Sequence, residues 1–321
     1  NPVDKSSVYY RGGNDIVNPH WLVRNYVNSS DVKRFFNSTS LNYDINDNFS
    51  ITYRLGLDTY FELQELRYNK GGPSSSLATT SGYYRSINIQ NTIWNQDLIL
   101  NWKKEFSEKF GMSALLGGNS RYDVYDQNGV ASQGQLAFGL FRHSNFSNSS
   151  SNDAYSGGSM NFGSEERRYG VYGNITLDYS DYLFLNLSAR NDWTSTVEAE
   201  NRSILYPGAS ISFIPSTAFD WNSSTVNDLK LRLGYGTSAG YPSPYRTRNV
   251  LDQSARAFDR GGVTQTHAVS NRLGNPNLRP ELHGELEFGV EAVMFNNKLR
   301  FDLSLYEKNT KDLITSAPID P

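Results

Sequence analysis

Residues 165–194 read EERRYGVYGNITLDYSDYLFLNLSARNDWT, and apolar side chains fall on every second position along most of the stretch. The alternation is interrupted once, at the polar turn Tyr179–Tyr182. Because successive side chains of a β-strand point to opposite faces, this pattern predicts two strands joined by a tight turn. Each strand has about a dozen residues, whereas strands of soluble proteins usually have roughly 5–6 and a tilted strand across a bilayer needs about 9–11. The stretch therefore predicts a hairpin long enough to cross a membrane.

The same alternation recurs along the chain. It is clear over 48–63, 228–235, 283–295 and 299–306, shorter over 205–213, and less regular over 31–44, 84–105 and 110–123. This gives about ten strands in five hairpins. Short turns alternate with long polar segments at 65–82, 124–165 and 239–282. Short turns at one end of the strands and long loops at the other are typical of outer-membrane barrels, whereas soluble domains favour loops of about 4–6 residues.

The composition excludes several classes of protein. The chain has 321 residues, no Cys and a net charge of -3, with 21 Tyr, 17 Phe and 5 Trp. No apolar run approaches the ~18 residues of a membrane helix, so a helical membrane protein is excluded. The lack of Cys argues against a disulfide framework, thiolate metal sites and a Cys nucleophile. The charge implies no basic surface for nucleic acid.

The charges also favour a barrel. Within the clear strands, Arg, Lys, Asp and Glu fall almost wholly on one face. A charge on the lipid face of a barrel costs about 2–4 kcal/mol at the midplane, while the lumen tolerates it. A soluble β-sandwich would also alternate. Strand length and the aromatic strand ends Tyr169, Tyr179, Tyr182 and Trp193 distinguish the two.

Five motifs resemble those of the SusC/RagA-type TonB-dependent transporters, in the order of that family. They are SARNDWTS at 188–195, LYPGASISF at 205–213, LKLRLGYG at 229–236, GNPNLRPE at 274–281, and the strand at 299–313. The resemblance implies an all-β, antiparallel transmembrane β-barrel. Residues 1–321 would be part of this barrel domain and supply about ten of its roughly 22 strands. It also implies a plug domain, which these residues do not include. Because the chain starts at Asn1 without a signal peptide, we expect a segment of a longer protein.

The resemblance further implies a function and partners. The whole protein would import a polar nutrient, an oligosaccharide or a peptide, through the outer membrane of a Gram-negative bacterium. A SusD-like surface lipoprotein would cover the long loops. TonB–ExbB–ExbD would supply energy through an N-terminal region, and outer-membrane lipid would surround the wall. Two alternatives stay open: a SusC-like barrel that is a structural or assembly subunit of a larger complex, and a soluble β-rich adhesin.

Catalytic or metal chemistry has little support in the sequence, so we predict no enzyme, no cofactor and no metal site. The four histidines, at 20, 143, 267 and 283, are scattered and lack metal-ligand spacing. Two other groups are candidates for binding. The loop aromatics Trp21, Tyr241, Tyr245 and Phe258 could contact a ligand or the lid protein, or lie at the headgroup level.

The second group consists of polar residues on the charged face of the predicted strands. They could line a substrate path, or form ion-pair ladders and plug contacts. They are Arg54, Asp58, Glu62, Arg168, Arg190, Asp192, Arg232, Glu287 and Arg300.

Overall fold

The computed structural model describes residues 3, 5–8, 18–72, 80–153, 159–219, 221, 223–259, 262–269 and 272–317. For residues 252–259 and 262–269 it describes the backbone alone.

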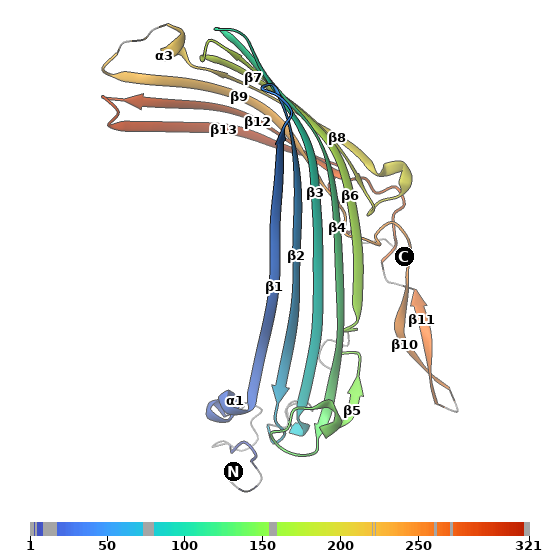
Figure 1. The fold of residues 1–321 in the computed structure, drawn as a ribbon. Coiled ribbons are helices and arrows are strands. Elements are labelled where there is room, and N and C mark those ends of the chain that lie inside the picture. The colour runs from blue at the N-terminus through green and yellow to red at the C-terminus, as the bar shows by residue number, and fades with distance from the viewer. Residues whose placement is uncertain are drawn as a thin grey trace.

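One large antiparallel sheet dominates the fold (Figure 1). Its main path runs β1-β2-β3-β4-β6-β7-β8-β9-β12-β13, so neighbours in sequence pair almost throughout. The strands are β1 (Tyr26–Asp44), β2 (Phe49–Tyr68), β3 (Tyr83–Ser107), β4 (Phe110–Gln135), β6 (Phe162–Tyr179), β7 (Leu183–Thr194), β8 (Ser203–Phe213), β9 (Val226–Gly240), β12 (Glu281–Met294) and β13 (Leu299–Lys311). Figure 1 shows an open, curved wall whose strands turn steadily from β1 to β13, as the twist of a sheet requires. The predicted all-β antiparallel barrel segment of about ten strands is confirmed.

The remaining described elements lie at the loop end of the wall or at its turns. Strand β5 (Phe146–Ser150) pairs with β4, and β10 (Leu251–Asp259) pairs with β11 (Gly262–Val269) in a separate hairpin. The helical segments are α1 (Pro19–Asn25), η1 (His143–Asn145), η2 (Ala199–Asn201) and α3 (Pro215–Ala218). No helix in the described part of the chain is long and apolar enough to cross a membrane.

The hairpin of residues 165–194 forms as its alternation predicts. Strand β6 ends at Tyr179 and β7 begins at Leu183, with Ser180 and Asp181 both at positive φ. Two successive positive φ angles characterise the tight turn that matches the twist of an antiparallel hairpin. The turn therefore fixes the register in which Ile175 lies opposite Leu187, and Asn174 opposite Ser188.

This register separates the wall into an apolar outer face and a polar inner face. Residues directly opposite one another in a sheet share a face, so the pairing can be followed from strand to strand. The outer face carries large apolar side chains that are all exposed: Leu98, Leu116, Ile175, Leu187, Ile211, Leu233, Phe288 and Leu303. A surface of this kind is stable only when lipid or another apolar partner covers it.

Aromatic rings border the apolar outer face. At the turn ends, Phe49, Trp102, Phe106 and Phe110 follow one another with ring centroids 5.7–6.4 Å apart. A second series of 5.6–6.2 Å contacts joins Tyr179, Tyr182, Phe213 and Phe219. At the opposite border Tyr169 lies opposite Trp193, about 10 residues along β6 from Tyr179, which is the length of a bilayer-crossing strand. The predicted aromatic strand ends thus lie at the two borders of one band.

Several strands extend well beyond this band at the loop end. Strands β3 and β4 have 25 and 26 residues, more than twice the ~9–11 that a bilayer requires. The predicted loop boundaries at 124–165 and 65–82 are therefore wrong in part, because β4 continues to Gln135 and β2 to Tyr68. The predicted loop 239–282 likewise contains the hairpin β10–β11. Above the band the outward side chains turn polar, as at Glu65, Arg67 and Asp126, so alternation no longer reveals the strand.

Candidate functional site

The inner face carries a buried carboxylate, Asp192, that joins two strands and a loop. Asp192 on β7 is 5% exposed and accepts hydrogen bonds from Arg190 Nε at 2.7 Å, Tyr241 Oη at 2.7 Å, and the Tyr206 hydroxyl. The guanidinium of Arg168 on β6 lies 5.2 Å from the centre of the Tyr241 ring. A buried carboxylate is stable only when charged or hydroxyl partners surround it, and this one has three.

Tyr241 fixes the loop that follows β9 to the inner wall. The residue comes directly after the last residue of β9, yet its hydroxyl reaches β7 across the width of β8. Burial and the Asp192 carboxylate raise the pKa of Tyr241, so the phenol stays protonated and donates. Tyr241, predicted to contact a ligand or lid, is thus an internal anchor in this structure.

Two further side chains bridge strands that are not neighbours. Tyr172 of β6 crosses β4 and directs its hydroxyl to Asp97 Oδ1 on β3 at 3.3 Å, where Asn119 Nδ2 of β4 also donates at 2.9 Å. Arg232 of β9 crosses β12 to reach Asp302 Oδ1 on β13 at 3.1 Å. Each bridge therefore fastens three adjacent strands through one side chain.

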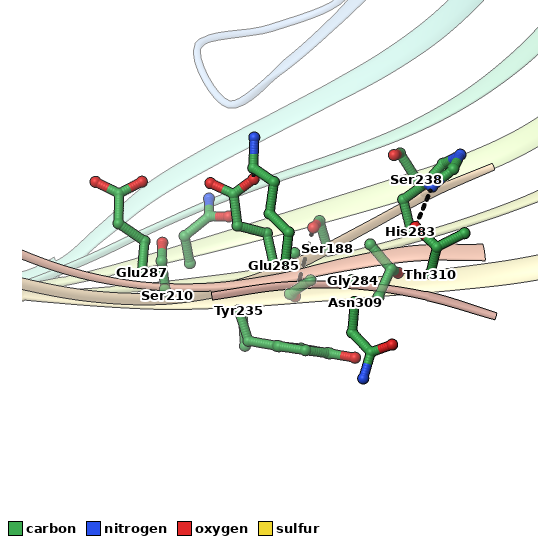
Figure 2. A pocket seen from close by; sticks show the side chains of 17 residues that line it. Ser188, Ser210, Tyr235, Ser238, His283, Gly284, Glu285, Glu287, Asn309 and Thr310 are labelled. Atoms are coloured by element: carbon green, nitrogen blue, oxygen red, sulfur yellow. Dashed lines mark hydrogen bonds and ion pairs between the residues drawn. The ribbon is translucent and has the colours of Figure 1, made fainter. Parts of the chain in front are cut away.

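A trough of about 640 Å³ is hollowed between β7, β8, β9, β12 and β13 (Figure 2). One inner-face row of the sheet crosses it, with Ser188, Gly208, Gly236, Glu285 and Lys308 opposite one another in turn. The floor is made largely of glycine and serine, and the backbone of β9 is open to approach. A Cβ placed on Gly236 would meet nothing within 4 Å.

Charged groups rise along one side of the trough. Figure 2 shows Glu285 and Glu287 pointing into the same open space as Ser188 and Ser210, while Tyr235 and Asn309 point to the opposite face. Glu285 pairs with Lys308 at 3.1 Å, and its side chain remains 39% exposed. Glu287 accepts from Ser304 Oγ at 2.9 Å and remains 41% exposed. The trough thus offers carboxylates, hydroxyls and open backbone, which suit a polar ligand.

The register places all nine predicted polar candidates on the inner face. Five of them belong to the clusters above: Arg168, Arg190, Asp192, Arg232 and Glu287. At the far side of the wall, Asp58 accepts from Arg34 Nε at 2.8 Å and Glu62 from Ser30 Oγ at 2.7 Å, while Arg54 lies opposite Asp97. Arg300 lies exposed on β13. Their part in binding stays a prediction.

The loop aromatics do not form one group. Trp21 lies on α1, where its Nε1 donates to the Lys5 carbonyl at 2.8 Å. Tyr245 is 58% exposed, at a φ of 63°. The side chain of Phe258, on β10, is outside the described residues. Sequence reasoning missed Tyr172 and Tyr206, although both fall on the polar phase of their strands and could have been found there.

Loop segments far apart in sequence are clasped beside this region. Arg248 binds Glu198 through two hydrogen bonds of 2.8 and 2.9 Å. These bonds to Arg248 lower the pKa of Glu198 to about 2. Gly274, the first residue of the GNPNLRPE motif, packs against the backbone of Arg248, and its N–H donates to Asn249 Oδ1 at 2.7 Å.

Among the described residues, no three His, Asp or Glu side chains are grouped so that they could hold a metal ion.

Comparison with known proteins gives a consistent result. A family model described as TonB dependent receptor-like, beta-barrel, matches residues 2–321. TonB-dependent receptors P26 and P3 of Formosa agariphila are 26% and 24% identical over 99% and 96% of this chain. The chain spans about a third of their length, 32% and 30%.

Two solved structures share the fold. The RagAB peptide transporter matches with a TM-score of 0.83 and 20% identity, over 98% of this chain and 34% of that one. The ferric-catecholate import receptor Fiu of E. coli matches with a TM-score of 0.52 and 13% identity, over 88% of this chain and 41% of that one. The fold of this chain therefore matches about a third of the RagAB transporter chain.

Proposed function

The chain belongs to the family of TonB-dependent receptor-like β-barrels, and from this premise we propose that it is part of the wall of an outer-membrane importer for a polar nutrient. The family is one of receptors and transporters rather than enzymes. The observation that carries the proposal is the division of one sheet, within the band, into an apolar, aromatic-bordered outer face and a mainly polar inner face. Such a wall has lipid on one side and water or protein on the other.

The trough supports a polar ligand on the inner side. Its floor leaves open space above Gly236, and the hydroxyls of Ser188 and Ser210 and the carboxylates of Glu285 and Glu287 stand around it. Hydroxyls of an oligosaccharide or the backbone of a peptide could satisfy these groups. The inner wall would thus act as a polar surface along the path of the nutrient.

The loops support a partner at the opening. The strands β2 to β4 stand well above the apolar band, and the clasp between Arg248 and Glu198 holds the loops of β7–β8 and β9 together. Such a raised rim suits a SusD-like surface lipoprotein as a lid. TonB–ExbB–ExbD would act through parts of the full protein outside this segment.

The placement in the membrane can be tested with adjacent residues. Spin labels at Leu187 and Ser188 of the full-length protein, reconstituted in liposomes, should respond oppositely. The label at 187 should relax faster with oxygen, which concentrates in lipid, and the label at 188 faster with a water-soluble nickel chelate. The reverse result, or equal access of the chelate to both sites, would overturn the proposal.

The import function needs a test in cells. A strain that lacks the full-length gene should lose energy-dependent uptake of one class of labelled nutrient, oligosaccharides or peptides, and regain it with the wild-type gene. Loss of uptake when TonB is removed should match loss of the gene itself. Unchanged uptake of both classes would contradict the importer and favour a structural subunit.

A further inference from the structure

The two bridging side chains of the inner wall lie directly over glycines. Tyr172 is opposite Gly117 of β4 in the register, and Arg232 is opposite Gly289 of β12. A Cβ added to Gly117 would lie 2.5 Å from Cε2 of the Tyr172 ring, and one on Gly289 would lie 2.6 Å from Arg232 Nε. Carbon atoms in contact need about 3.5–4.0 Å, so the space above each glycine is filled.

A larger residue at Gly117 or Gly289 would force the bridging side chain to move, and only one direction is open to it. The strand itself lies beneath each bridging side chain, and the hydrogen bond to Asp97 or Asp302 holds its tip. The ring of Tyr172 or the guanidinium of Arg232 would therefore have to rise from the wall, away from the backbone. Rising breaks the hydrogen bond at the tip and moves the group into the inner space.

We infer that Gly117 and Gly289 are positioning residues of the transport path, because they keep Tyr172 and Arg232 flat against the wall. Each glycine keeps the cross-section of the transport path open. It also keeps the bridging side chain bonded to Asp97 or Asp302, so that this carboxylate does not hold the passing nutrient. The inference rests on the proposed function, since it treats the inner face as the surface past which the nutrient moves. The position of the side chains can be measured without transport.

The chain provides a matched control beside Gly117. Gly118 faces outward, and a Cβ there would meet nothing within 4 Å. Gly117→Ala and Gly118→Ala therefore add the same methyl group to adjacent positions of one strand, with the same change in backbone preference. Only the first displaces an inner side chain.

The first experiment locates the ring. A 3-fluorotyrosine at position 172 of the full-length protein reports its exposure through the ¹⁹F relaxation caused by a water-soluble paramagnetic compound. Gly117→Ala should increase this relaxation severalfold and shift the resonance, whereas Gly118→Ala should leave both unchanged. Equal spectra for the two variants would overturn the positioning role, whatever the protein transports.

The second experiment asks whether the displaced ring obstructs the path. Gly117→Ala should slow import severalfold, and more for a long oligomer of the nutrient than for its shortest form. Adding Tyr172→Ala should restore the rate, because the obstructing ring is gone. A double variant as slow as Gly117→Ala would overturn the inference, while failure of the wild-type protein to import would count against the proposed function alone.

The pair Gly289 and Arg232 keeps the test decisive if Gly117→Ala does not fold. Gly289→Ala should slow import and adding Arg232→Ala should restore it, with the outward-facing Gly118→Ala again as the control that displaces nothing. No rescue at this pair, in protein that folds, would likewise overturn the inference.

Discussion

Glycine serves opposite purposes in two regions of the inner wall. Between β3 and β7 the inner glycines are covered: Tyr172 lies over Gly117, and the Arg190–Asp192 pair lies over Gly170. In the trough the two glycines of β9 are open, with nothing within 4 Å of a Cβ on Gly236 and only Ser210 Cβ near one on Gly234, while Ser188 partly covers Gly208 on β8. In the first region the polar side chains bond to one another, as Tyr172 does to Asp97 and Arg190 to Asp192. The second leaves the side chains of Glu285 and Glu287 part-exposed beside uncovered glycines.

The difference lies in what stands opposite each glycine. A long hydrogen-bonding side chain in the facing position, such as Tyr172, folds over the gap and reaches the next strand. In the trough the facing positions on β8 hold a glycine or a serine, as with Gly208 opposite Gly236, and the facing Glu285 on β12 pairs with Lys308 on β13 instead of covering the glycine. A glycine of the inner wall therefore either lies beneath a side chain that links strands or leaves the strand surface accessible, according to the residue it faces.

Removal of Asp192 should produce the largest effect, because it dismantles the covered region. Asp192→Ala leaves Arg190 without its carboxylate in a mostly buried setting and should lower the free energy of unfolding by about 3 kcal/mol. Asp302→Ala removes a carboxylate that is 65% exposed and should cost less than about 1 kcal/mol. Thermal unfolding of the full-length protein in detergent measures both. Equal losses would mean that the covered region is no more interdependent than the rest.

A methyl group on a covered glycine should come next. The Cβ of Gly170→Ala would lie 2.5 Å from Arg190 Nη2, and such overpacking should cost about 1–3 kcal/mol. Gly236→Ala, in open space, should stay within about 0.5 kcal/mol of the wild type. The same unfolding assay compares the two. A destabilising Gly236→Ala would show that the trough floor is already occupied in the whole protein.

Filling the trough should affect binding rather than stability. Gly236→Val raises the floor and should weaken binding of the imported nutrient about tenfold, or ~1.4 kcal/mol. Gly118→Val, on the outer face, provides the control. Isothermal titration with the nutrient identified by uptake gives both constants. Unchanged affinity in Gly236→Val would remove the trough from the path.

The smallest effect concerns the loop clasp at the rim of both regions. The pKa of Glu198 is lowered from 4.5 to about 2 by its hydrogen bonds to Arg248. The clasp therefore stabilises the loop fully above pH 4.5, and its contribution is lost as the pH falls toward 2. Hydrogen exchange of residues 241–250 should increase between pH 5 and pH 3 beyond the intrinsic change. Glu198→Gln should exchange fast at both values, and a wild type that behaves like it would exclude the clasp.

The sequence predicted the strands best where the wall meets lipid. From 165 to 194 the alternation is sharp because one face must be apolar, and β6 and β7 end where it ends. Above the apolar band the outward face meets water, so outward positions become polar, as at Asp126 and Asn128, while the inner face buries apolar residues such as Ile87 and Ile89, and the phase of the alternation is lost. Strand β4 consequently runs a dozen residues past its predicted end at 123.

The site was predictable only in part. The face of each charged residue follows from its position parity, and all nine polar candidates lie on the expected face. Their partners depend on the register between strands that are distant in sequence, such as Arg232 with Asp302. The trough depends on glycines and serines that carry no chemical signature until pairing places them side by side. Only the pairing shows which glycines are covered.

The unbroken register of the first three strands has a mechanical consequence. From Tyr26 to Asp44 every residue of β1 has its partner on β2, and β2 pairs with β3 from Phe49 to Tyr68 without a bulge. Sliding by one residue would send every outward side chain inward, and sliding by two would part Arg34 from Asp58. The first three strands therefore resist sliding past one another, and this side of the molecule responds to force as one rigid plate.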